Sequence, residues 1–92
     1  MRVRPRPRVV VAEDDSEMRR LLRRALERED CDVIECLDGR ELLSVVSELH
    51  AQNALPQLVV TDLRMPLASG LEVLEAFKAA ALSIPFILIT GF

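Results

Sequence analysis

The sequence at residues 58–66 is LVVTDLRMP, a short apolar run that ends in an acidic residue and is followed by a proline-containing stretch. Two further apolar runs end in polar residues in the same way; they are VVVAEDD at 9–15 and FILITG at 86–91. Segments with helical spacing of apolar residues separate the runs, and this pattern favours buried parallel strands joined by helices. Because the carboxyl ends of parallel strands meet at one edge of a sheet, we expect the polar groups that end the three runs to lie together.

The predicted order of elements along the chain is β-α-β-α-β-α-β, with right-handed crossovers. Strands are expected over residues 8–12, 32–37, 58–61 and 85–90. Helices are expected from Asp15 or Ser16, the candidate N-caps, to about residue 29, and then over residues 39–52 and 71–80. This order predicts an α/β fold with an open, doubly wound parallel sheet.

Apolar residues recur at helical spacing in each predicted helix and are expected to face the core. The sets are Met18, Leu21, Leu22, Ala25 and Leu26 in the first helix, Leu42, Leu43, Val45, Val46 and Leu49 in the second, and Leu71, Leu74 and Phe77 in the third. The other side of the first helix carries most of five arginines, Arg19, Arg20, Arg23, Arg24 and Arg28. We interpret them as a solvated face with Glu27 and Glu29 as local counter-charges; a surface for an acidic partner is the alternative.

The composition is that of one small globular domain, because the chain has 92 residues, of which 50% are hydrophobic and 29% are charged. No apolar run approaches the ~20 residues that a membrane span requires, and no secretory signal is recognisable, so we expect no membrane association and a cytoplasmic location. Residues 1–8 alternate Arg with Val or Pro and are interpreted as a disordered basic leader, or alternatively as a contact for a phosphate backbone or an acidic partner. Cys31, Cys36 and the lone His50 are interpreted as free thiols and a solvated imidazole.

The polar groups at the three run ends suit phosphoryl chemistry. Asp62 is a candidate nucleophile, since a carboxylate can attack phosphorus and form an acyl phosphate. Together with Glu13 and Asp14 it would crowd three negative charges, which raises at least one carboxylate pKa without metal and makes the site suited to Mg²⁺. Thr90 would offer a hydroxyl to a phosphoryl oxygen, and Gly91 would let its N–H come close because no Cβ intervenes.

These residues resemble the receiver domain of two-component response regulators. The resemblance lies in the segments VVAEDDS at 10–16, VVTDLRMP at 59–66, Gly70 and ILITG at 87–91, and it covers the chain from about Val9 to its end. It implies a flavodoxin-like sheet in the order 2-1-3-4-5 and a receiver domain at residues 9–92. It also implies Mg²⁺ as the cofactor and a histidine kinase or phosphotransfer protein as the partner.

The resemblance further implies a role for each matching position. Asp62 would be the phospho-acceptor, and Thr90 would be the switch hydroxyl. The metal ligands would be Glu13, Asp14, Asp62 and the backbone carbonyl of Arg64, with Asp14 the more direct of the acidic pair. The backbone N–H groups that contact phosphoryl oxygens would be those of Leu63 and Gly91.

The sequence departs from the family pattern after residue 90. Relatives continue with a helix, a strand ending in a Lys that pairs with the acyl phosphate, and a last helix, whereas this sequence ends at Phe92 and its one lysine is Lys78. We therefore expect an incomplete (βα)4-type core that self-associates through the edge of its fourth strand.

Two other functions were considered besides a phosphorylated switch. One is an interaction or dimerisation module that phosphorylation does not switch. The other, a hydrolase of the haloacid dehalogenase type, is disfavoured because those enzymes have a second Asp where this chain has Arg64. A C-terminal effector domain in the native protein is a further expectation from the resemblance.

Overall fold

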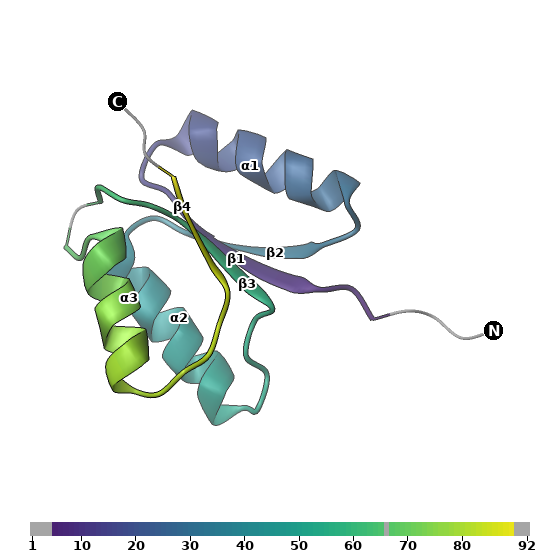
Figure 1. Ribbon diagram of the computed structural model, residues 1–92. Coiled ribbons are helices and arrows are strands. Elements are labelled where there is room, and N and C mark those ends of the chain that lie inside the picture. The colour runs from purple at the N-terminus through teal and green to yellow at the C-terminus, as the bar shows by residue number, and fades with distance from the viewer. Residues whose placement is uncertain (1–4, 66, 90–92) are drawn as a thin grey trace.

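A parallel sheet lies between one helix on one face and two helices on the other (Figure 1). The computed structural model describes residues 5–65 and 67–89, and within them the elements are β1 (Arg8–Ala12), α1 (Ser16–Arg28), β2 (Asp32–Cys36), α2 (Gly39–Ala51), β3 (Leu58–Asp62), α3 (Gly70–Ala79) and β4 (Phe86–Ile89). The strand order is β2-β1-β3-β4, and every pairing is parallel. This arrangement confirms the predicted α/β fold and the predicted order of these strands.

The element boundaries agree with the sequence expectation to within one residue where the structure describes them. β2 ends at Cys36 rather than Leu37, which is 51% exposed. β3 extends one residue further than predicted and includes Asp62, which pairs with Ile89 of β4. Thr90 and Gly91, at the predicted end of the last strand, lie outside the described residues.

The core is divided by the sheet because successive side chains of a strand point to opposite faces. On the side of α2 and α3, Val10 and Val59 pack with Leu42, Val73 and Phe77. On the side of α1, the buried set is Val9, Val11 and Val60, and Leu22 and Leu26 pack against it. The strands next to each other at the centre of the sheet, β1 and β3, are therefore covered on both faces and hold the residues that follow them in fixed positions.

Two of the expected helix faces need correction. In α1 only Leu22 and Leu26 pack against the core, whereas Met18 is 41% and Leu21 60% exposed and Ala25 is also exposed. The face of α1 that is buried is therefore narrower than the predicted apolar stripe. The buried face is the one that lies over β1 and β2.

In α3 the inward face consists of Gly70, Val73 and Phe77, and Leu71 is 51% exposed. The cause is Gly70, because a Cβ at this position would lie 2.7 Å from the carbonyl oxygen of Asp62. The helix therefore places its glycine against the end of β3, and the residues three and seven positions later share that face. Leu71, one residue on, is turned away from the sheet.

The helix ends follow known capping patterns. Asp15 caps α1 by accepting the N–H groups of Glu17 and Met18, as one of the two predicted caps. Each helix ends in a Schellman motif in which the residue after the C-cap has a positive φ. These residues are Asp30, Asn53 and Ala81, with φ angles of 59°, 55° and 57°. None of them is glycine, so each carries a Cβ in a conformation that disfavours one.

The described part of the basic leader runs beside the start of the sheet. Residues 5–7 are exposed, yet the carbonyl of Pro7 accepts the N–H of Asp32 at 2.8 Å. Arg8, the last residue of the leader segment, is also the first residue of β1. Within residues 5–65 and 67–89, none of the helices has the length and apolarity that a membrane crossing needs.

Candidate functional site

Three carboxylates meet at the carboxyl edge of the sheet. Glu13 and Asp14 directly follow β1, and Asp62 is the last residue of β3. β1 and β3 are neighbours with Ala12 opposite Thr61, so the next residue of each strand comes to the same edge. One carboxylate oxygen from each of the three acids lies within 4.8 Å of the others. The predicted convergence of these groups is therefore confirmed.

The three acids differ in their contact with solvent. Glu13 is only 3% exposed, Asp14 is exposed and Asp62 is half-buried. Burial raises the pKa of Glu13 to about 7, and the Asp14 and Asp62 side chains add to the rise, while a hydrogen bond from the Asp15 N–H to Oε2 of Glu13, at 3.1 Å, opposes it. The expectation that crowding raises at least one carboxylate pKa is confirmed, although burial is the larger cause. Near neutral pH, a proton or a cation can therefore satisfy this site.

A small divalent cation fits these donors. Mg²⁺ prefers about six oxygen ligands at 2.0–2.1 Å, so opposite ligands lie about 4.2 Å apart. The three carboxylate oxygens lie within 4.8 Å of one another, so small side-chain movements are enough to bring them around one such ion. All three donors are hard oxygen atoms, which suit magnesium, calcium or manganese rather than a thiolate-binding metal.

The carboxylate of Asp62 is oriented by the backbone that follows it. Its Oδ1 accepts the N–H of Arg64 at 3.0 Å, which fixes the carboxylate against the loop. The N–H of Leu63 donates instead to the carbonyl of Ile89 at 3.0 Å, because the pairing of β3 with β4 continues one residue beyond Asp62. The expectation that Leu63 offers its N–H to a phosphoryl oxygen stays a prediction, and in this structure that N–H is paired with β4. The Arg64 N–H is the backbone donor next to the acid.

The loop after Asp62 is held by contacts that sequence reasoning did not identify. Thr61 is fully buried, and its Oγ1 lies 3.7 Å from Sδ of Met65. Ala68 is buried against Gly39, at the start of α2, where a Cβ would overlap the Ala68 carbonyl. Two features of the sequence could have indicated these contacts. They are the polar Thr61 near the end of an apolar run and the Asp38-Gly39 turn. The loop that follows Asp62 is thereby held against the core and α2.

Two arginines of α1 are part of the site's surroundings rather than a solvated face. Arg19 donates to the backbone carbonyl of Glu13 at 2.8 Å and pairs with Glu35 of β2 at 3.3 Å. Arg23 pairs with the other Glu35 oxygen at 2.8 Å and lies 3.8 Å from Glu27. The solvated-face interpretation is therefore wrong for Arg19 and right only in part for Arg23, which also pairs with Glu27 as expected. It is confirmed for Arg20, Arg24 and Arg28, which are exposed.

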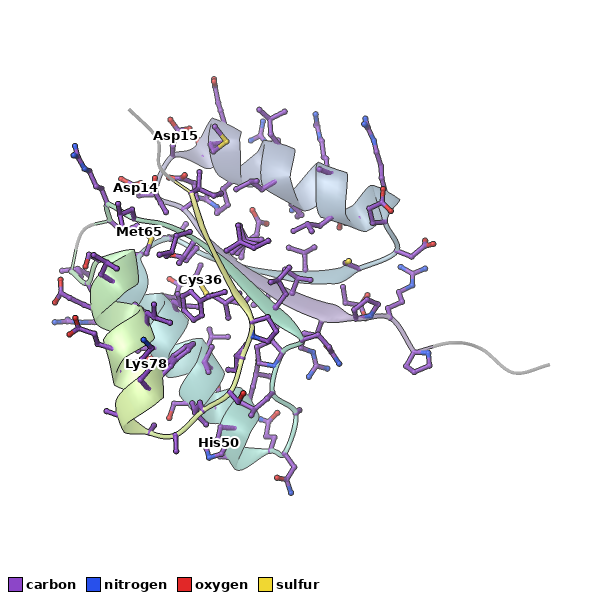
Figure 2. All side chains as sticks on the ribbon, in the orientation of Figure 1. Asp14, Asp15, Cys36, His50, Met65 and Lys78 are labelled. Atoms are coloured by element: carbon purple, nitrogen blue, oxygen red, sulfur yellow. The ribbon has the colours of Figure 1, made fainter. Side chains whose placement is uncertain are left out.

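The remaining residues considered from the sequence lie away from the acids. Figure 2 shows His50 and Lys78 well separated from Asp14, which lies at the same end of the sheet as Met65. His50 is exposed in the last turn of α2, as expected. Cys31 and Cys36 are free thiols, and burial raises the pKa of Cys36 to about 12, with the charges of Glu41 and Asp38 adding to it.

Comparison with protein families gives a match over most of the chain. The model described as "Response regulator receiver domain" matches residues 9–92. The "Alkaline phosphatase synthesis transcriptional regulatory protein PhoP" of Bacillus subtilis is 31% identical over 84 residues, which are 91% of this chain and 33% of that protein. The "Transcriptional regulatory protein PrrA" of Mycobacterium tuberculosis is 33% identical over 79 residues, which are 86% of this chain and 32% of that protein. The chain therefore spans about a third of the length of these relatives.

Solved structures give the same result for the fold. The N-terminal domain of an uncharacterized protein from Wolinella succinogenes aligns with a TM-score of 0.80 at 31% identity, covering 94% of this chain and 65% of that one. A response regulator receiver domain protein from Clostridium thermocellum aligns with a TM-score of 0.81 at 26% identity, covering 92% of this chain and 65% of that one. The sheet and helices described above thus have the flavodoxin-like architecture of these structures.

Proposed function

This chain belongs to the response regulator receiver domain family, and on that basis we propose that Asp62 accepts a phosphoryl group from a histidine kinase or a phosphotransfer protein. The observation that supports this role is the meeting of Asp62 with Glu13 and Asp14 at the end of β3. A single acid at a strand end is common, whereas three within 4.8 Å of one another are costly without a bound cation.

The proposed transfer is a direct displacement at phosphorus. A carboxylate oxygen of Asp62 forms a bond to phosphorus while the bond to the donor's imidazole nitrogen breaks. The bonding electron pair stays on that nitrogen, which then takes a proton from solvent. The Arg64 N–H holds the Asp62 carboxylate in place during the attack, through the 3.0 Å hydrogen bond to Oδ1.

Mg²⁺ is the cofactor in this proposal. Its ligands would be the carboxylates of Glu13, Asp14 and Asp62 and the backbone carbonyl of Arg64, with Asp14 the more direct member of the pair. When bound, it supplies charge screening between the phosphoryl oxygens and the acids. The exposed position of Asp14 leaves room for water ligands as well, which Mg²⁺ usually keeps.

Thr90 and Gly91 complete the proposed site. They follow Ile89, whose register partner in β3 is Asp62. The Thr90 hydroxyl would donate to a phosphoryl oxygen and act as the switch, and the Gly91 N–H would be a second donor. The added charge would shift an equilibrium between two conformations of the domain, which an output domain then detects.

The wider biological setting is part of the same proposal. The relatives named above are transcriptional regulators about three times as long as the matched segment, so we infer a C-terminal effector domain in the native protein. A cytoplasmic location belongs to the same proposal.

Self-association is a second proposal that does not depend on phosphorylation. Within the described residues, β4 is paired on one side by β3, and its Ile87 is 50% exposed. Such an edge can add a strand from a second copy. Sedimentation at increasing concentration tests this, and a monomer at all concentrations would reject it. If a partner then binds the Asp62→Ala variant as well as the unmodified protein, the interaction-module alternative is supported.

Phosphorylation is tested with a small phosphodonor such as acetyl phosphate. Intact mass should show the gain of one phosphoryl group in the presence of Mg²⁺ and none after chelation or in Asp62→Asn. Asp15→Asn is the matched control, because Asp15 neighbours the cluster but is outside it and Asn caps a helix equally well. Labelling that persists in Asp62→Asn would reject Asp62 as the acceptor.

A further inference from the structure

We propose that Arg19 is a positioning residue for the acidic metal pair, and that Glu35 holds Arg19 in the conformation this requires. The inference rests on the proposed Mg²⁺ site and extends it to a residue in α1 that touches neither the cation nor the phosphoryl group. It is carried by hydrogen bonds that fix the backbone between Glu13 and Asp14.

The Glu13 backbone is held from two sides. Its N–H donates to the carbonyl of Cys36 in β2 at 3.1 Å, and its carbonyl accepts Nη1 of Arg19 at 2.8 Å. That carbonyl belongs to the peptide unit that joins Glu13 to Asp14. A rotation of this peptide unit would turn both side chains, so one hydrogen bond from Arg19 constrains the direction of two candidate metal ligands.

The Arg19 side chain is itself held in place. It is only 15% exposed, and its Nε lies 3.3 Å from Oε1 of Glu35. The other carboxylate oxygen of Glu35 is 2.8 Å from Nη1 of Arg23. Glu35 of β2 thus binds arginines from two turns of α1. The guanidinium of Arg19 contacts both Glu35 and the Glu13 carbonyl at the end of β1.

A guanidinium is required because the two contacts lie in different directions. Arg presents several N–H donors in a rigid plane, so it can bind a carboxylate through Nε and a carbonyl through Nη1 at the same time. Lys has the same charge but a single flexible ammonium group. Arg19→Lys therefore keeps the charge near the acids and loses the fixed geometry.

The positive charge of Arg19 and its positioning of the Glu13 carbonyl should have opposite effects on the affinity for Mg²⁺. A cation beside three acids competes with Mg²⁺, so removal of the charge alone would strengthen metal binding. Glu35 offsets part of that charge. If Arg19→Lys, which keeps the charge, binds Mg²⁺ more weakly, the cause is therefore the lost positioning of Glu13 and Asp14.

The test is a Mg²⁺ titration of the unmodified protein, Arg19→Lys and Arg23→Lys, followed by the amide NMR shifts of Asp14, Asp15 and Asp62. Arg23→Lys is the matched control, because Arg23 shares Glu35 with Arg19 but makes no contact with Glu13. We expect the dissociation constant of Arg19→Lys to rise about tenfold, the low end for loss of a group that orients a metal ligand. The constant of Arg23→Lys should stay within about twofold of the unmodified value.

Metal-free spectra provide a second readout. The Asp14 and Asp15 amide signals should shift in Arg19→Lys and not in Arg23→Lys, because only Arg19 holds the Glu13 carbonyl. Equal losses of Mg²⁺ affinity in both variants would mean that the arginines merely attach α1 to β2, and would overturn the inference. An unchanged affinity in Arg19→Lys would also overturn it. If the unmodified protein binds no Mg²⁺, the proposed metal site fails, and the inference fails with it.

Discussion

Glu13 and Asp62 come together because β1 and β3 pair in parallel with Ala12 opposite Thr61. The two acids are the next residues of their strands at the same edge of the sheet. Glu13 is nevertheless 3% exposed, while Asp62 is half-buried and accepts the Arg64 N–H. The register of the two strands thus places Glu13 in a buried position and Asp62 in a more accessible one.

The first prediction concerns stability and pH without metal. Burial raises the pKa of Glu13 from 4.5 to about 7 in the folded state, so the folded protein binds this proton more tightly than the unfolded chain. The folded state therefore loses stability as pH rises from about 4.5 to about 7, by on the order of 3 kcal/mol, and little more above that. Thermal unfolding in EDTA between pH 5 and 8.5 measures this change.

Mg²⁺ should reverse that loss only where Glu13 is ionised. At pH 8 the cation should raise the melting temperature, and at pH 5.5 it should do so much less, because it must displace the Glu13 proton. Glu13→Gln is the control, since it keeps the shape of the side chain and removes the titration. Without metal, the melting temperature should depend on pH less in Glu13→Gln than in the unmodified protein. An equal dependence in both would contradict the assignment of this titration to Glu13.

The second prediction concerns the contact between α3 and the end of β3. Gly70→Ala would place a Cβ 2.7 Å from the Asp62 carbonyl oxygen and 3.1 Å from Leu88. Since the backbone of β3 is fixed in the sheet, we expect a loss of about 2 kcal/mol in the free energy of unfolding, measured by urea denaturation. Mg²⁺ affinity should fall as well, because the added Cβ presses on the backbone of Asp62, a candidate metal ligand. Unchanged stability and affinity would show that α3 can shift without affecting Asp62.

The strands and their polar ends could be predicted from the sequence because both depend on local pattern. Short apolar runs separated by helical spacing allow few arrangements, and parallel strands then bring Glu13, Asp14 and Asp62 to one edge. The cap of α1 was equally local, since Asp15 needs only the first turn of that helix to act.

The features that were missed depend on contacts between distant segments. The face of α3 was wrong because Gly70 packs against the end of β3, which helical spacing alone does not indicate. The pairing of the Leu63 N–H with the Ile89 carbonyl was not foreseen because it is set by the register of β3 with β4. Arg19 was placed in a solvated face because nothing near it in the sequence shows that Glu35 lies opposite α1.

The third prediction concerns the two thiols. Cys36 is fully buried with a pKa raised to about 12, whereas Cys31 is half-buried in the connection between α1 and β2. Because the thiolate is the reactive form, Cys31 should react with iodoacetamide in the folded protein and Cys36 should react only after unfolding. Intact mass after alkylation at pH 8 should show one added group, and Cys31→Ser should show none. One addition to the folded Cys31→Ser variant, or two additions to the folded unmodified protein, would contradict the burial of Cys36.

The last prediction concerns the ends of the helices. Ala81 follows the C-cap of α3 at φ 57°, a left-handed conformation in which its Cβ is unfavourable. Glycine has no such penalty, although it loses more backbone entropy on folding, so Ala81→Gly should stabilise the protein by about 0.5–1 kcal/mol. Asn53→Gly is the matched comparison, because Asn53 occupies the same position after α2 at φ 55° and Asn tolerates this conformation. Urea unfolding should give a clear gain for Ala81→Gly and a smaller one for Asn53→Gly, and the reverse order would mean that local backbone strain does not determine the stability of these two turns.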